Sequence, residues 1–198
     1  MGVLSFQSDG HVYLHGDQPI PSVTQIISEM GLMSDFAVDP WYLERGSAVH
    51  LACEYLDKNC LDWDSLDDEI RPRVEAYQKF KKDYSFEPRM IEQPVHSHVL
   101  NVACTPDRMG IVDNYLSVIE IKSGGRQKWH RLQLSIQDIC IREELEESEI
   151  LSQLHRYSLE LKSDGTYKLP RRYKEDEADR KAAESLVILY HWLKEGKR

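Results

Sequence analysis

The chain has 198 residues, 41% of them hydrophobic, which is enough to bury a substantial core without staples. Its 34 acidic residues outnumber 25 basic ones, and the net charge of −9 excludes a protein that coats nucleic acid through bulk charge. No stretch approaches the ~18 apolar residues of a membrane span, and the N-terminus lacks a signal-peptide pattern. We therefore expect one soluble, cytoplasmic domain over residues 1–198, with no membrane contact.

Cysteine spacing gives no sign of a disulfide framework or a zinc finger. The cysteines stand at Cys53, Cys60, Cys104 and Cys140. They form no Cys-x-x-Cys pair and no Cys/His pair at zinc-finger spacing, which fits a reducing compartment.

Hydrophobic periodicity and turn residues divide the chain into alternating helices and strands. In chain order, the expected elements are a strand at 11–14, helices at 22–31, 40–58 and 70–84, a strand at 89–99, a hairpin at 105–122, a helix at 129–144, a hairpin at 154–169 and a helix at 176–195. Ser22 is a suitable N-cap and Gly31 a suitable C-terminal stop for the first helix.

The helix at 40–58 carries a polar face as well as an apolar one. Gly46, His50 and Glu54 recur at helical spacing on that polar face. Glycine inside a helix costs about 1 kcal/mol relative to alanine, which suggests that another backbone or a ligand approaches there. His50 is either a helix histidine satisfied by Glu54 or a ligand beside that gap.

The hairpin at 105–122 concentrates the ionisable residues. Asp113-Asn114 tolerates the positive φ of a tight turn, and counting outward from it places Asp107 opposite Glu120. Lys122 lies two residues beyond Glu120, so both side chains project from the same face. Two facing carboxylates repel each other, whereas a divalent cation between them would make the arrangement favourable. Hard oxygen ligands favour Mg²⁺ or Mn²⁺, and a neighbouring lysine can bind a phosphate, so the pattern outlines a phosphodiester hydrolysis site.

Two further polar positions have alternative interpretations. Glu92, in the strand before the hairpin, is either a third carboxylate of the site or an edge-strand charge. Gln133 and Gln137 lie one turn apart near the start of the helix at 129–144. They are either solvated or placed to hold a phosphate or a water.

Several motifs in this order resemble the PD-(D/E)XK nuclease superfamily, in its branch of RecB-like exonucleases and phage exonucleases related to lambda exonuclease. The resemblance covers roughly residues 19–140. The motifs are Pro106-Asp107, Glu120-Ile121-Lys122, Pro21-Ser22-Val23-Thr24, the segment from Arg45 to His50, Ser123-Gly124, and Trp129 followed by Gln133.

The resemblance implies an α/β (α+β) fold with a restriction-endonuclease-like core, in which helices flank a central mixed β-sheet. The core spans about 19–145, and the hairpin and helix at 154–196 pack on it. The implied metal ligands are His50, Asp107, Glu120 and the Ile121 carbonyl. Lys122 matches the catalytic lysine and Gln133 the family glutamine.

The match is incomplete at some positions. Gln137 stands where the family has tyrosine, and Glu54 and Glu92 are candidate additional acids. Iron-sulfur relatives carry closely spaced late cysteines, whereas this chain has none after Cys140, so we expect no cluster.

The implied activity is Mg²⁺-dependent hydrolysis of DNA, with Mn²⁺ able to substitute. The resemblance favours an exonuclease of phage or bacterial DNA recombination or repair, acting in the bacterial cytoplasm. The alternatives are a structure-specific or nicking endonuclease and a catalytically idle nucleic-acid-binding module. Besides DNA, the candidate partners are further copies of the same chain, assembled as a ring, and a single-strand annealing protein. The candidate DNA contacts are Arg45, Arg126, Lys128 and Arg131, with Arg171, Arg172 and Lys174 as a second group.

Overall fold

A computed structural model of the chain describes residues 3–7, 10–33, 40–145, 154–170 and 177–195. The basic group at 171–174 lies outside these ranges. Within them, the helices are α1 Val23–Glu29, α2 Pro40–Asp57, the short 3₁₀ helix η1 Trp63–Ser65, α3 Arg71–Asp83, α4 His130–Glu144 and α5 Glu177–Glu195. No helix in the described ranges is long and apolar enough to cross a membrane.

The strands of the described ranges form one central sheet and two small ones. The central sheet has the spatial order β10-β9-β8-β7-β4, formed by β4 Pro88–Ile91, β7 Arg108–Val112, β8 Tyr115–Lys122, β9 His155–Leu161 and β10 Tyr167–Lys168. The small sheets are formed by β1 Leu4–Gln7, β2 Val12–His15 and β3 Gln18–Ile20, and by β5 Val95–Ser97 and β6 Val102–Cys104. Because β8 and β9 are parallel and the other pairs antiparallel, the central sheet is mixed, as expected.

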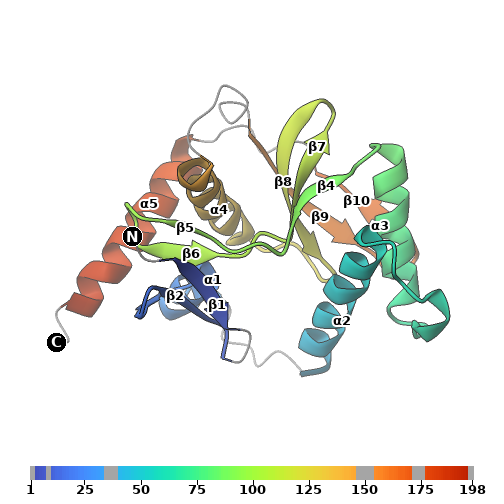
Figure 1. Cartoon of the computed structure of the whole chain (residues 1–198), viewed down its shortest axis with the longest axis horizontal. Helices are drawn as coiled ribbons and strands as arrows, with labels where there is room; N and C mark the ends of the chain where they lie inside the picture. Colours follow the sequence, from blue (N-terminus) through green and yellow to red (C-terminus); the bar gives the residue numbers. More distant parts are fainter. Residues whose placement is uncertain (1–2, 8–9, 34–39, 146–153, 171–176, 196–198) are drawn as a thin grey trace.

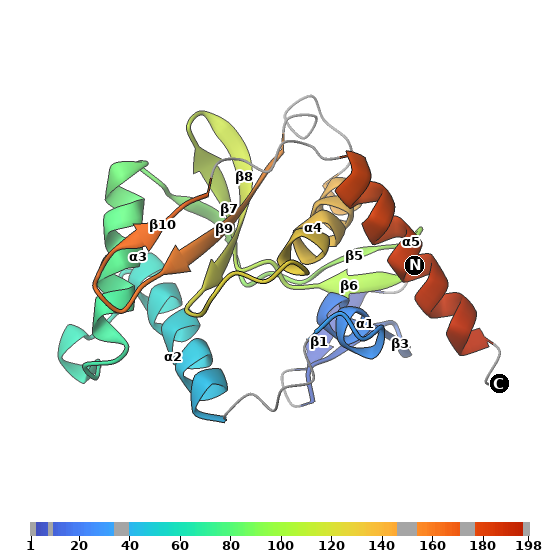
Figure 2. The same ribbon diagram turned by 180° about the vertical axis from the view of Figure 1, so that it is seen from behind.

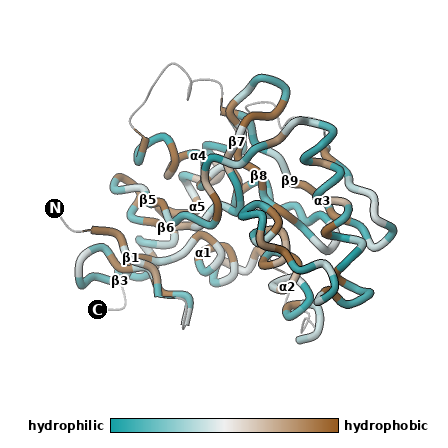
Figure 3. Tube along the Cα trace, turned by 45° about the vertical axis from the view of Figure 1, so that its right-hand side comes forward, coloured by the Kyte–Doolittle hydropathy of each residue, from teal (hydrophilic) through white to brown (hydrophobic). Residues whose placement is uncertain are grey.

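Helices cover both faces of the central sheet (Figures 1 and 2). Val118 of β8 belongs to the core shared with α1, α4 and α5, whereas Ile119 and Ile121 belong to the core shared with α2 and α3. This alternation follows from the two-residue period of a strand, and it directs Glu120 toward the α4 side. Figure 3 shows hydrophobic and hydrophilic residues mixed along α2, which buries Val49, Ala52 and Cys53 but exposes other hydrophobic side chains such as Leu43 and Leu51.

The central hairpin has the predicted register. Val112 pairs with Tyr115 and Arg108 with Ile119, and both turn residues, Asp113 and Asn114, have positive φ. The ladder ends at Arg108, one residue after Asp107. The sheet is also closely packed here, because a Cβ on Gly110 of β7 would lie 2.6 Å from the Glu87 carbonyl oxygen.

The prediction of a single strand over residues 89–99 is wrong. The structure divides it into β4 and β5, which belong to different sheets, and Glu92 between them has a φ of 46°. β5 then pairs with β6, so the segment before Thr105 leaves the central sheet. A left-handed residue bends the chain out of the sheet, and composition alone does not mark that position because glutamate rarely adopts it.

The other expected elements are confirmed with small shifts at their ends. Ser22 caps α1 by accepting a hydrogen bond from the Gln25 backbone N–H at 3.0 Å, and Gly31 has a φ of 69°. The hairpin of β9 and β10 forms as predicted, and β9 lies beside β8. β1, β3 and β6 were missed. They are short strands of three or four residues, and β3 contains a proline that sequence patterns assign to a loop.

Candidate active site

Asp107 lies immediately before β7, where two elements hold its carboxylate. Asp107 Oδ2 accepts a hydrogen bond from the Ile121 backbone N–H at 2.6 Å, and Oδ1 lies 3.3 Å from His50 Nδ1. The other ring nitrogen, His50 Nε2, lies 3.1 Å from the Ile121 carbonyl oxygen. His50 of α2 therefore bridges Asp107 and the strand that carries Glu120 and Lys122.

Glu92 completes a cluster with these two residues. Its Oε1 lies 3.7 Å from His50 Nδ1 and accepts a hydrogen bond from Arg108 Nη1 at 3.0 Å. One ligand atom each from His50, Glu92 and Asp107 lie within 4.8 Å of one another. Of the two interpretations of Glu92, this geometry favours the third carboxylate near the site.

Glu120 is held by side chains from α4. Gln133 Nε2 donates to Glu120 Oε1 at 2.6 Å, and Gln137 Nε2 donates to Oε2 at 2.8 Å. Lys122 Nζ lies 3.0 Å from Glu120 Oε1 and 3.3 Å from Gln133 Oε1, and it sits over the ring of Trp129. Both glutamines are buried, so they are not a solvated surface. Gln137 orients the second oxygen of Glu120.

Burial and neighbouring charges shift the pKa values of these groups in different directions. Burial alone would lower the pKa of His50, but the Asp107 and Glu92 carboxylates raise it to about 10. Burial opposes ionisation of Asp107, yet His50 and Lys122 hold its pKa below the usual range. Burial and the Asp107 charge raise the pKa of Glu120. A cation bound between the two acids would relieve this repulsion.

The donor set fits a divalent cation. Carboxylate oxygens of Glu92 and Asp107 and a ring nitrogen of His50 come together from three segments of the chain, and the Ile121 carbonyl lies 3.1 Å from the other ring nitrogen of His50. Oxygen donors suit Mg²⁺ and Mn²⁺, and an imidazole shifts the preference toward Mn²⁺. Glu120 faces the same pocket of about 290 Å³ as Asp107, lined also by Thr105 and Gln133.

Not all predicted residues join this cluster. Glu54 lines the neighbouring pocket with His50 but forms an ion pair with Lys58 at 2.5 Å. Arg131 forms an ion pair with Asp179 of α5 at 2.8 Å. His50 is therefore not satisfied by Glu54, and Arg131 has a structural contact of its own.

The remaining predicted basic residues surround the end of β8. Arg45 Nη2 donates to the Ser123 carbonyl at 3.2 Å, and its guanidinium lies over the rings of Trp41 and Tyr42 at 4.8 and 5.0 Å. Arg126 and Lys128 are exposed in the loop between β8 and α4. Burial, and then the charges of Lys122 and Arg126, lower the pKa of His130 to about 3. Positive charge therefore accumulates beside Lys122.

The sequence did not reveal two groups that support the site. Tyr13 of β2 lies 2.7 Å from Thr105 Oγ1 through its hydroxyl and lines the pocket with Asp107 and Glu120. Arg108 donates to the Asp107 carbonyl and to Asp57 of α2, both at 2.6 Å. A charged residue at the start of an otherwise apolar strand was the available signal for Arg108. We find no such signal for Tyr13.

Metal binding should be coupled to proton release from His50. With a pKa raised to about 10, His50 is protonated at pH 7 without metal, and it must lose that proton to coordinate. The apparent Mn²⁺ affinity should therefore increase with pH, by about tenfold per pH unit between roughly pH 7 and 8.5. Titration calorimetry in buffers of different ionisation enthalpy measures the released proton.

The matched variant for this titration is His50→Gln, which removes the titrating group. The Mn²⁺ affinity of this variant should depend less on pH, and the variant should release less than half as many protons per bound Mn²⁺ as the wild type. Equal proton release by the wild type and this variant would contradict the role of His50.

The mixed central sheet and the helices on both its faces define an α/β fold, which brings Asp107 and Glu120 to one pocket. Among solved structures, the chain is similar to one from Eubacterium rectale described as a "Putative exonuclease", with a TM-score of 0.51 and 9% sequence identity. The match covers 91% of this chain and 76% of that chain. At this identity the similarity shows the fold alone. No family model matches the chain, and no curated protein does.

Proposed function

We propose that the protein is a metal-dependent DNA nuclease of the PD-(D/E)XK type, with Asp107 and Glu120 at its centre. The observation that carries this proposal is the convergence of His50, Glu92 and Asp107 within 4.8 Å, beside a lysine that is held against Glu120. A protein built only for stability would avoid burying several acids together. The nuclease-like fold supports the same conclusion.

The side chains divide the work of the reaction. His50, Glu92, Asp107, Glu120 and the Ile121 carbonyl are the groups that would hold Mg²⁺ or Mn²⁺. A bound divalent ion supplies Lewis-acid stabilisation of charge developing on the phosphate.

Lys122 acts on the attacking water or on the developing negative charge, and Gln133 holds both Lys122 and Glu120 in place. Gln137 fixes the second oxygen of Glu120. These contacts hold the Lys122 amine beside Glu120, at the site where the phosphate would be cleaved.

DNA would approach the site over the loop that follows β8. The net charge of −9 disfavours a polyanion, so a local basic surface must offset it. Arg126 and Lys128 lie exposed on this loop, and Arg45 reaches its first residue, Ser123. We assign DNA binding to Arg126, Lys128 and Arg45. Arg131, which pairs with Asp179, contributes less.

Lys122→Met tests the assignment because it removes the charge while keeping most of the side chain. Cleavage should decrease by about 10²-fold or more, as expected for loss of a group that moves a proton or binds the developing charge. Mn²⁺ binding should persist, because the acids remain. The assay uses end-labelled linear duplex, single-stranded DNA and closed circular DNA with Mg²⁺. Lys168→Met, an exposed lysine of β10, is the control.

The same assay separates the alternatives. An exonuclease digests linear DNA from its ends and leaves the closed circle intact, whereas an endonuclease cuts the circle. If the wild-type protein does not bind Mn²⁺ and does not cleave any of the three substrates, the result supports a catalytically idle nucleic-acid-binding module. Undiminished cleavage by Lys122→Met would show that the catalytic group lies elsewhere.

A further inference from the structure

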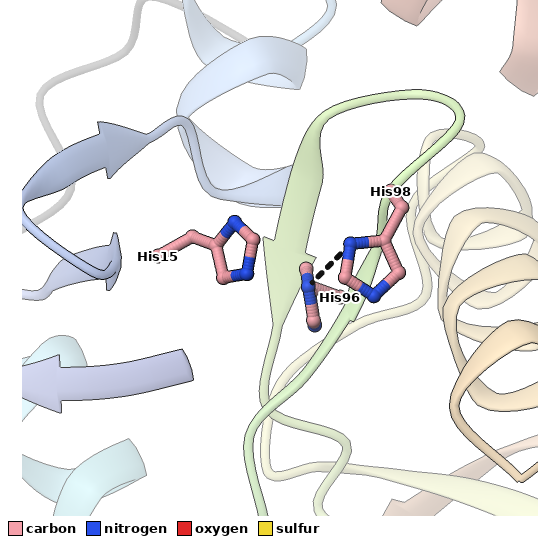
Figure 4. Close-up of side chains that lie close together, drawn as sticks. All are labelled: His15, His96 and His98. Carbon is pink, nitrogen blue, oxygen red and sulfur yellow. Dashed lines mark hydrogen bonds between the residues drawn. The ribbon is translucent and has the colours of Figure 1, made fainter. Parts of the chain in front are cut away.

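A second cluster of metal-ligating side chains lies away from Asp107. It consists of His15 at the end of β2, His96 in β5 and His98 in the turn after β5, and one ring nitrogen from each lies within 4.8 Å of the others. Figure 4 shows the three imidazoles side by side, with His15 approaching from the N-terminal sheet and His98 on the other side of His96. The cluster thus joins two sheets that are far apart in the sequence.

The spacing of the rings suits a tetrahedral metal site. His96 Nε2 and His98 Nδ1 lie 3.1 Å apart. Two nitrogen ligands of a tetrahedral zinc ion, each about 2.0–2.1 Å from the metal, are separated by about 3.3 Å. The His15 ring centroid lies 5.1 Å from that of His96 and 5.3 Å from that of His98. Small rotations of side chains bring the third nitrogen to the same centre.

A carboxylate supports the most buried of the three histidines. Glu144 Oε2, at the end of α4, lies 3.2 Å from His96 Nδ1. Metal-binding histidines usually donate their second ring N–H to a carboxylate, which fixes the tautomer and directs the other nitrogen to the metal. Here that other nitrogen, Nε2, faces His98. His96 is 5% exposed whereas His98 is exposed, so an ion can enter from the His98 side.

We propose that His15, His96 and His98 bind one Zn²⁺, with Glu144 as a positioning residue for His96. Imidazole nitrogens select zinc and related transition metals over Mg²⁺, so this site and the acidic site take different ions. Solvent occupies the remaining coordination position.

The ion would fasten the N-terminal sheet to the rest of the molecule. β2 carries Tyr13, whose hydroxyl lies 2.7 Å from Thr105 at the edge of the acidic pocket, and His15 lies two residues further along the same strand. Fixing His15 to the β5–β6 hairpin therefore holds Tyr13 in place. The role is structural, because the histidines contribute no side chain to the lining of that pocket.

The test is zinc binding to the untagged full chain after chelator treatment, measured with Zn²⁺ alone in competition with a chromophoric chelator. Wild type and Asp107→Asn should both bind one Zn²⁺ tightly, and Zn²⁺ should raise the unfolding temperature of both. His98→Ala, at an exposed position, should lose at least about 10²-fold in affinity while keeping its circular dichroism spectrum and its Mn²⁺ binding. Glu144→Gln should weaken zinc binding by about 10–100-fold.

His191→Ala is the matched control, because His191 contacts the Asn101 carbonyl beside the same hairpin but lies outside the cluster. It should bind Zn²⁺ as the wild type does. Co²⁺ in place of Zn²⁺ should give the visible absorption of a four-coordinate nitrogen site in wild type but not in His98→Ala. Wild-type zinc affinity in folded His98→Ala, or loss of all tight zinc binding in Asp107→Asn, would overturn the proposal.

Discussion

Asp107→Asn should reduce metal-dependent DNA cleavage by about 10³-fold or more, because a catalytic metal contributes several kcal/mol and each 1.36 kcal/mol corresponds to about tenfold in rate. The substitution removes one charge from the cluster of His50, Glu92 and Asp107. An amide oxygen can still accept the hydrogen bond from the Ile121 N–H, so the hairpin should remain folded. Mn²⁺ binding by calorimetry should weaken in parallel with the cleavage rate.

Asp113→Asn is the matched control for this variant. It makes the same change in the same hairpin, but at the turn, where the residue has a φ of 50° that asparagine accepts readily. Its cleavage rate and metal affinity should equal those of the wild type. If Asp107→Asn cleaved DNA as fast as Asp113→Asn, Asp107 would have no catalytic role and the proposed site would be wrong.

The part of the site that lies within the hairpin could be predicted because its geometry is local. The Asp113-Asn114 turn fixes the pairing of the two strands, and the two-residue period of a strand then determines which side chains share a face. The shared face of Glu120 and Lys122 on β8 follows from counting alone, whereas Asp107 lies one residue before the observed ladder begins. A slip of one residue would have reversed every side chain, and the observed pairing of Arg108 with Ile119 excludes it.

The contacts between elements could not be predicted in this way. Helical periodicity placed Gln133 and Gln137 on one face of α4, but it could not show that this face packs over Glu120. Polar residues at helical spacing are expected both on a solvated face and on a buried polar face, so the sequence does not distinguish the two. The alternative partner for His50, Glu54, was a reasonable choice within one helix, whereas the actual partners come from β8 and from the segments before β7.

Glu92 shows a different limit. Strand composition predicted one continuous strand through this position, and the backbone instead turns with a positive φ. This conformation costs free energy for a residue with a side chain, and such strain is stored where the surrounding structure compensates for it. Here the compensation is the ion pair with Arg108 and the contact with His50. Local propensity carries no information about such partners.

Arg108 contacts Asp57, Glu92 and the Asp107 carbonyl, which come from separate segments. Of the substitutions considered, its replacement should cause the largest loss of stability. Its side chain and that of Asp57 are both 0% exposed, and Nε donates to Asp57 Oδ2 at 2.6 Å. The same guanidinium holds Glu92 and the Asp107 carbonyl. Arg108→Met leaves Asp57 buried, with Lys81 and the Tyr77 hydroxyl as its remaining side-chain partners among the described residues. We expect a loss of about 3–5 kcal/mol in the free energy of unfolding, measured in urea.

Two further variants show whether the buried charge is the cause. Asp57→Asn combined with Arg108→Met removes both charges, so the double variant should be more stable than the sum of the single changes predicts. Arg180→Met breaks an exposed ion pair with Glu184 on α5 and should remain within about 0.5 kcal/mol of the wild type. Because Arg108 also holds Glu92, folded Arg108→Met should bind Mn²⁺ more weakly at low temperature. A loss below about 1 kcal/mol with unchanged Mn²⁺ affinity would mean that Arg108 is not needed to assemble the acids.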